Sequence, residues 1–139
     1  MSRRMEWIVG IGLGLAILGV GSGLLWREHR AYLERLAREQ LEIPLEWARL
    51  APYPASARDL KATTEGRMFS RAFRVSFQAP AAEIERWLKD SPGTREAMPA
   101  HHPKPGVRHF EIRPGGGAQH AEVTVEDATG TVRIFVYWS

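Results

Sequence analysis

The pattern of apolar and polar positions divides the chain into three parts with different periods. Residues 7–26, WIVGIGLGLAILGVGSGLLW, form an unbroken apolar run without a charged residue. Residues 27–43 place apolar side chains at helical spacing, and from residue 68 onwards apolar and polar positions alternate as they do in strands. The pattern therefore predicts a membrane helix, an amphipathic stalk helix and a head domain that contains a sheet.

The apolar run has the dimensions of a transmembrane helix. Twenty residues rising about 1.5 Å each cover about 30 Å, the thickness of the hydrocarbon core of a bilayer. Trp7 and Trp26 close the run where indole rings prefer to lie, at the two membrane interfaces. The run is longer than the core of a cleaved signal peptide, and no small-residue cleavage site follows it. We expect an uncleaved signal-anchor in a single-pass protein, with residues 1–6 as a short tail.

Glycines recur within this run at the spacing of helix contacts in membranes. Gly10 and Gly14 form one G-x-x-x-G pair, and Gly19 and Gly23 form another. They predict a homo-oligomer, or a protein partner, held through the transmembrane helix; the alternative is a glycine-rich anchor without a partner. A dinucleotide-binding loop is rejected because no strand precedes the glycines and no polar-faced helix follows them.

Arginines on both sides of the run bear on its orientation. More arginines follow the run than precede it, which by the positive-inside rule would place the head in the cytoplasm. Arg3 and Arg4 emerge first, however, and can hold the short tail inside. We favour an extracytoplasmic head and keep a cytoplasmic head as the alternative.

The segment between the membrane and the head is expected to be a helix followed by a linker. Leu33, Leu36 and Leu41 fall on one helical face, and Pro44 is expected to end the stalk helix, giving it the bounds 27–43. Residues 44–67 are predicted as an irregular linker. Within it, the capping-box-like spacing of Ser56 and Asp59 predicts one or two helical turns over residues 57–63.

The head, residues 68–139, is predicted to begin with a strand and a helix. Residues 68–79 alternate, and the apolar face of this strand is formed by Phe69, Phe73, Val75, Phe77 and Ala79. A helix starts at Pro80, and Trp87 dominates its apolar face. A long loop is expected over residues 93–106.

The last third of the chain is predicted to be a meander of three strands. Pairing Arg113 with Ala118 in the first hairpin places Phe110 opposite Ala121. Pairing Glu126 with Thr131 in the second gives one almost wholly apolar face, as a buried sheet requires. The fold class is therefore α+β, a small two-layer β-α-β-β-β domain in which one helix covers an antiparallel sheet.

The same register places four candidate ligands on the opposite face. His109 is expected opposite Glu122, and Glu111 opposite His120. Imidazole and carboxylate groups suit a divalent metal such as Zn²⁺, and a neighbouring His and Glu can also exchange protons. Phe135 and Tyr137 are predicted beside them as an exposed aromatic patch. The alternative is an ordinary solvated sheet face.

Composition and charge remove several classes of function. The chain has 139 residues, a net charge of +3 and no cysteine, so thiolate chemistry is excluded. Lysine and arginine are spread through the whole sequence and form no basic block, which argues against nucleic acid as a partner. Nothing in the sequence indicates a cofactor, and no serine lies in the context of a hydrolase nucleophile.

We therefore expect a membrane-anchored protein whose head acts as a protein-interaction or envelope accessory module without catalysis. The alternative is a metal- or small-ligand-binding sensor that uses the His/Glu cluster.

Overall fold

The computed structural model describes residues 26–139. The chain divides into two compact units, Met1–Ala37 and Arg38–Ser139. The described part of the first unit, residues 26–37, is helical, and its side chains are almost all exposed. The predicted transmembrane segment lies outside the described residues except for Trp26. Between residues 26 and 139 no helix is both long enough and apolar enough to cross a bilayer.

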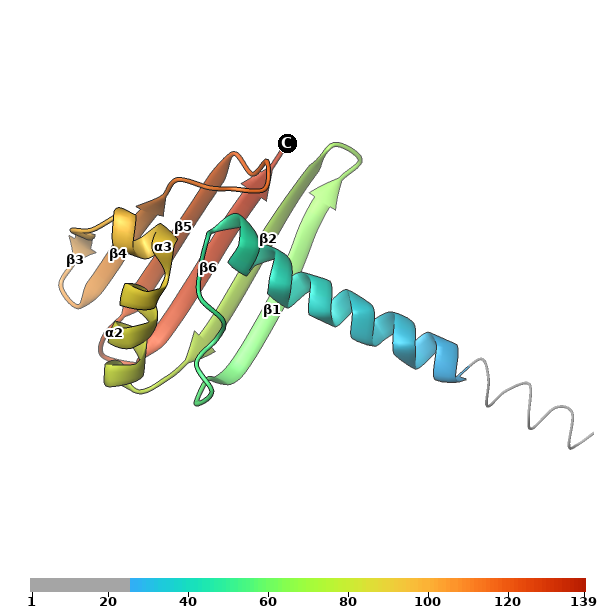
Figure 1. Ribbon diagram of the computed structural model, residues 1–139, viewed down its shortest axis with the longest axis horizontal. Coiled ribbons are helices and arrows are strands. Elements are labelled where there is room, and N and C mark those ends of the chain that lie inside the picture. Colours follow the sequence, from blue (N-terminus) through green and yellow to red (C-terminus); the bar gives the residue numbers. More distant parts are fainter. Residues whose placement is uncertain (1–25) are drawn as a thin grey trace, which may run out of the picture. The chain divides into compact units, whose positions relative to one another are not determined.

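The second unit is an α+β domain built on one antiparallel sheet (Figure 1). Its six described strands are β1 (Arg58–Arg67), β2 (Ser70–Gln78), β3 (His101–Lys104), β4 (Val107–Ile112), β5 (His120–Glu126) and β6 (Thr131–Trp138). They lie in the order β1-β2-β6-β5-β4-β3. Two short helices, α2 (Ala81–Asp90) and α3 (Pro92–Glu96), connect β2 to β3. The predicted α+β fold is confirmed, with a larger sheet than expected.

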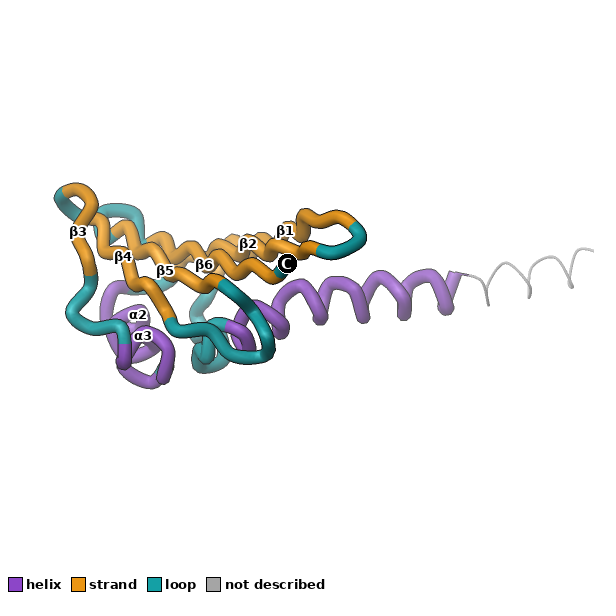
Figure 2. Tube along the Cα trace, turned by 90° about the horizontal axis from the view of Figure 1, so that it is seen from above, coloured by secondary structure: helices purple, strands orange, loops and turns teal. Residues whose placement is uncertain are grey.

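The helices and the main core lie on one side of the sheet (Figure 2). Ile84, Trp87 and Leu88 from α2 pack on the apolar face formed by β2, β4, β5 and β6. The buried Trp87 indole donates its hydrogen bond to the Ala51 carbonyl at 3.0 Å. No buried side-chain nitrogen or oxygen within the described part of the chain lacks a partner.

Pro44 does not end the helix that precedes the sheet. Helical conformation continues to residue 47, and the Ala48 amide donates to the Pro44 carbonyl at 3.0 Å. Pro44 and Ala48 are both buried in the head. Proline removes one hydrogen bond from a helix interior, but burial of this last turn offsets that cost.

The predicted helical turns over residues 57–63 are wrong, because residues 58–63 belong to strand β1. Asp59, the second member of the predicted capping box with Ser56, has a positive φ of 52° and lies at an irregularity in the pairing of β1 with β2. Thr63 and Thr64 suit a strand, and hydrogen bonding to β2 supplies the tertiary pairing that overrides a weak local helix signal. The predicted linker therefore contains a full strand.

Phe69 is not a core residue. The first predicted strand begins two residues later than expected, and Met68 and Phe69 form the turn between β1 and β2. Phe69 is 76% exposed, whereas Phe73 and Phe77 are buried. The expected loop over residues 93–106 contains α3 and the edge strand β3.

The two hairpins of the meander differ in how well their register was predicted. The β5–β6 register is confirmed, because Glu126 pairs with Thr131 and Val123 with Ile134. The β4–β5 register is wrong by two residues, since Phe110 faces Val123 instead of Ala121. The connecting loop folds back against the chain: the Gly115 amide donates to the Trp47 carbonyl at 2.8 Å, which lengthens the loop. A two-residue shift preserves the faces of the strands.

Candidate functional site

The candidate site is the face of the sheet opposite α2 and α3, called here the outer face. No helix among residues 38–139 lies on this side (Figure 2). Strand alternation places every second side chain of β2, β4, β5 and β6 on it, between the buried positions of the core.

The four predicted His and Glu residues lie on this outer face, but with different partners. His109 faces Thr124 instead of Glu122, and Glu111 faces Glu122 instead of His120. Both expected pairings are therefore wrong, because the β4–β5 register is shifted by two residues. The shift places one carboxylate opposite another and leaves Glu111 exposed.

Glu122 is the centre of the contacts that remain. Its Oε2 lies 3.1 Å from Nε2 of His120 and 3.7 Å from Nε2 of His109. The other ring nitrogen of His109 lies 3.3 Å from the Thr124 hydroxyl. One carboxylate can thus pair with two imidazoles when these carry protons.

In the described structure, side chains of this cluster are connected by hydrogen bonds. Within residues 26–139, no three His, Asp or Glu side chains converge in an arrangement that could hold a metal ion. Metal binding by His109, Glu111, His120 and Glu122 therefore stays a prediction.

Cations and an aromatic ring lie next to the cluster, on β2 and β6. The Arg74 guanidinium carbon lies 4.4 Å from the centroid of the Phe135 ring, in a cation–π contact. The centroid of the His120 ring lies 5.9 Å from the centroid of the same Phe135 ring. Arg74 also lies 3.8 Å from Glu65 of β1, and Arg133 lies 3.2 Å from Glu126. Both arginines are more than half exposed, so these ion pairs are weak.

The outer face is hollowed between β1, β2, β6 and β5. The hollow has a volume of about 410 Å³. The charged and aromatic side chains of its lining are Lys61, Arg74, Arg133, Glu122 and Phe135, and hydroxyls are contributed by Thr63, Ser76 and Thr124. Three cations and one carboxylate thus line the hollow. Arg74 and Arg133 already pair with Glu65 and Glu126, whereas Lys61 forms no ion pair with any other described residue.

The predicted aromatic patch is less accessible than expected. Phe135 and Tyr137 are half-buried, because their neighbours on β2 and β5 cover part of each ring. The most exposed large apolar side chains of the head are Met68 and Phe69, at 86% and 76%. Both lie at the tip of the β1–β2 hairpin.

The predicted membrane residues fall at the start of the chain. Trp7, Gly10, Gly14, Gly19 and Gly23 lie outside the described residues. Trp26 is described and is 70% exposed.

The contribution of β1 to the outer face was missed from the sequence. Lys61 and Thr63 line the hollow, yet their segment was predicted to be a linker with helical turns. The signal that could have shown it is the alternation of Lys61, Thr63, Glu65 and Arg67 ahead of a two-residue turn.

Comparison with family models, with curated proteins and with solved structures found no match.

Proposed function

We propose that the protein is a single-pass membrane protein whose head binds a protein partner at the outer face of its sheet. In this proposal, residues 7–26 form the anchor, and the head faces the extracytoplasmic side as an accessory module of the envelope without catalytic activity. The alternative orientation would place the same head in the cytoplasm.

The observation that carries the proposal is the hollow on the uncovered sheet face. One face of the sheet buries the core, whereas the other presents a concave, partly aromatic surface with exposed cations. An uncovered face of this kind offers area for a partner, and a half-buried ring beside arginines is typical of the centre of protein interfaces.

The charge of the hollow indicates the chemistry of the partner. Lys61, Arg74 and Arg133 outnumber the one carboxylate of the lining, Glu122. The two arginines also pair with carboxylates beside the hollow, but these pairs are exposed and weak, so a carboxylate of a partner can replace them. The arginine guanidinium groups match carboxylates in bidentate geometry. We therefore infer a polypeptide segment that carries Asp or Glu side chains.

Photo-crosslinking from the hollow tests this proposal in the full chain, in membranes. Benzoylphenylalanine in place of Phe135 keeps an aromatic ring at the site, and benzoylphenylalanine in place of the exposed Lys89 on α2 is the control. We expect a protease-sensitive adduct from position 135 whose cross-linked peptide contains Asp or Glu. The Arg74→Glu/Arg133→Glu variant should reduce its yield about tenfold, because like charges would then face the partner.

Three outcomes would count against the proposal. The first is an equal yield of adduct from position 89, and the second is a yield from position 135 that does not change in the charge-reversed variant. The third is an adduct with nucleic acid instead of protein. The melting temperature of the charge-reversed variant serves as the control for folding, and we expect only a small decrease because the ion pairs that it loses, with Glu65 and Glu126, are exposed and weak.

The sensor alternative is supported by the contact of two imidazoles with Glu122. Titration with Zn²⁺ separates it from the interaction proposal, because a sensor would gain thermal stability from the metal and lose that gain in His120→Ala.

A further inference from the structure

Strand β1 presents a long open edge. It is the longest of the six described strands, with ten residues, and it pairs only with β2 on one side. All its residues except Ala62 are exposed, and it contains no proline. A sheet edge of this kind offers a row of unpaired backbone N–H and C=O groups to another strand.

The β1–β2 turn determines which residues offer these groups. Met68 and Phe69 form a two-residue turn, so the flanking pair Arg67 and Ser70 bonds across the hairpin. The bonded pairs of an antiparallel ladder recur at every second residue. Lys61, Thr63 and Glu65 therefore bond towards β2, whereas Ala62, Thr64 and Gly66 direct their backbone groups to the open edge.

We propose that the open edge of β1 pairs with β1 of a second copy of this chain, antiparallel and centred on Thr63. Ala62 then forms backbone hydrogen bonds with Thr64 of the second copy, and the two-fold axis repeats these bonds. The side chains on the outer face fall at the positions between the bonded pairs, where facing Cα atoms are closest, at about 4.5 Å.

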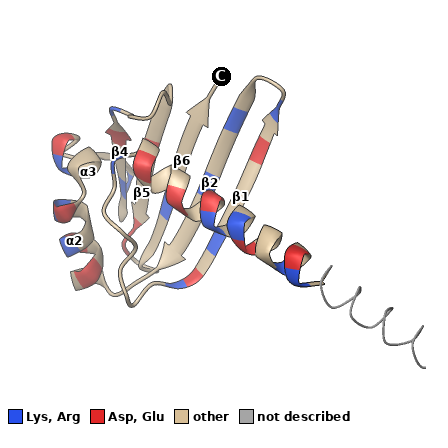
Figure 3. Ribbon diagram, turned by 45° about the vertical axis from the view of Figure 1, so that its right-hand side comes forward, with Lys and Arg blue, Asp and Glu red and all other residues tan. Residues whose placement is uncertain are grey.

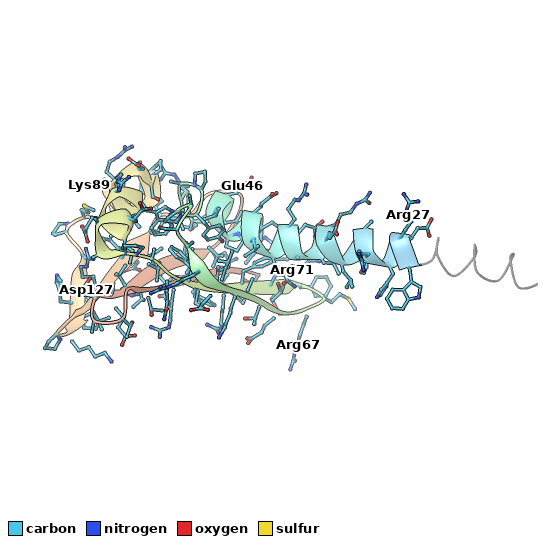
Figure 4. All side chains as sticks on the ribbon, turned by 90° about the horizontal axis from the view of Figure 1, so that it is seen from below. Arg27, Glu46, Arg67, Arg71, Lys89 and Asp127 are labelled. Atoms are coloured by element: carbon cyan, nitrogen blue, oxygen red, sulfur yellow. The ribbon has the colours of Figure 1, made fainter. Side chains whose placement is uncertain are left out.

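Charge complementarity supports the second copy as the occupant of this edge. In the register centred on Thr63, Lys61 faces Glu65 of the second copy, and symmetry forms the same pair twice. Acidic and basic bands alternate along β1 (Figure 3). Arg67, which belongs to this series, projects on the side of the sheet away from Lys89 of α2 (Figure 4). Opposite charges that face each other across strands stabilise the pairing.

The neighbouring registers lack this complementarity. Centring the pair on Thr64 places Lys61 opposite Arg67. Centring it on Ala62 places Lys61 opposite Thr63, without a partner charge, and Glu65 beside the irregularity at Asp59. Centring it on Lys61 or Glu65 places each of these charges opposite its own copy. Like charges directly opposite each other destabilise a strand pair, so the sequence of β1 selects the register at Thr63. Such a contact uses the same surface on both copies and closes as a dimer.

A single cysteine at the two-fold axis tests this register. The chain contains no cysteine, so Thr63→Cys introduces one thiol per copy. Facing cysteines at a separation of about 4.5 Å between Cα atoms lie within the range that a disulfide bridges. Lys104→Cys, on the exposed edge strand β3, is the matched control.

The measurement is non-reducing electrophoresis of the full chain in mild detergent after gentle oxidation. We expect a disulfide-linked dimer from Thr63→Cys at about tenfold the yield from Lys104→Cys, since only the former meets its own copy in bridging geometry. Equal yields from the two variants, or a monomer from both, would overturn the proposal.

Charge exchange provides a second, independent test. Lys61→Glu and Glu65→Lys should each weaken dimerisation about tenfold, because each places like charges opposite each other twice. The double variant Lys61→Glu/Glu65→Lys exchanges the two charges and should restore the dimer, as measured by sedimentation. Indifference of the dimer to all three variants would instead indicate association through another part of the chain and would overturn pairing through β1.

The dimer is argued from the open edge of β1 and the proposed function from the outer face, and the two share Lys61 and Thr63, which line the hollow. Thr63→Cys reports on the sheet edge, whereas cross-linking from position 135 reports on the outer face. Either can fail while the other holds.

Discussion

At the scale of single residues, Tyr53 links the helix that ends at residue 47 to the core of the head. Its hydroxyl donates a hydrogen bond to the Leu41 carbonyl at 2.8 Å, and its ring meets Phe77 edge-on at 5.6 Å. Burial raises the pKa of Tyr53 above its ordinary value. The folded state therefore keeps this phenol protonated at a pH where the unfolded chain loses the proton.

The sign of this shift predicts a loss of stability at alkaline pH. The contribution is complete below the unfolded pKa of about 10 and is lost as the pH rises towards the raised folded pKa. The free energy of unfolding should fall by at most about 1.4 kcal/mol per pH unit in this range through Tyr53. In Tyr53→Phe, this decrease of the free energy of unfolding with pH should be absent. At neutral pH, the free energy of unfolding of the variant should be about 1 kcal/mol lower, because the hydrogen bond of the hydroxyl is lost.

Denaturant unfolding of the two proteins across this pH range measures the difference. All other titrating groups are common to both, so the difference between the two curves isolates Tyr53. Parallel curves above about pH 10 would show that this hydroxyl is not protected by burial.

At this scale, the sequence predicts faces better than it predicts partners. Alternation alone places His109, Glu111, His120 and Glu122 on one face, because the period of a strand is two residues. Which residues meet depends on the length of the loop between β4 and β5, and in this loop Gly115 bonds to Trp47, which lies outside both strands. Nothing local to β4 or β5 encodes that bond.

At the scale of elements, the short helix α3 depends on a close approach to the segment after the first helix. Gly93, near the start of α3, has no room for a side chain, because a Cβ would collide with the Ala48 carbonyl oxygen. The Gly93 amide also donates to the Arg49 carbonyl at 2.9 Å. Glycine is required here by proximity of the backbones and not by a positive φ.

Gly93→Ala should therefore destabilise the head by about 1–3 kcal/mol, the usual cost of overpacking a tight contact. Gly115→Ala is the matched control, because a Cβ at Gly115 would make only ordinary contacts with the Arg49 side chain at 3.5 Å. Thermal unfolding of both variants measures the contrast. If Gly93→Ala and the control had the same melting temperature, Ala48 would have to move aside without a cost in stability.

Elements that bury one face could be predicted, and elements that bury neither face could not. β2, β4, β5 and β6 alternate because one side of each faces the core, and α2 carries its apolar residues on one side for the same reason. β1 and β3 are edge strands with little burial, so their sequences lack alternating apolar positions, and β1 shows only the weaker alternation of polar side chains from Lys61 to Arg67. The pairing that makes them strands is supplied by their neighbours in the sheet.

At the scale of the whole molecule, the proposed anchor is the feature that distinguishes this chain from an isolated α+β domain. We expect the full chain to stay with membranes washed in alkaline carbonate, because about 20 apolar residues are enough to span a bilayer. A variant that lacks residues 1–26 should be released. Replacing Gly14 and Gly23 by leucine should leave membrane retention unchanged, since leucine is at least as apolar. Release of the full chain by carbonate would contradict the proposal.

The attachment of the head has a mechanical consequence. Residues 44–57 are held to the core at several points: Pro44 is buried, the Arg49 guanidinium clamps Glu96 through two hydrogen bonds of 2.7 Å, and Ala51 bonds to both Trp87 and Ser91. A pulling force applied at residue 38 would therefore load this clamped segment and α2 before it reached strand β1. The force would have to break these bonds together before it could separate β1 from the sheet. The head can therefore stay folded under mechanical load.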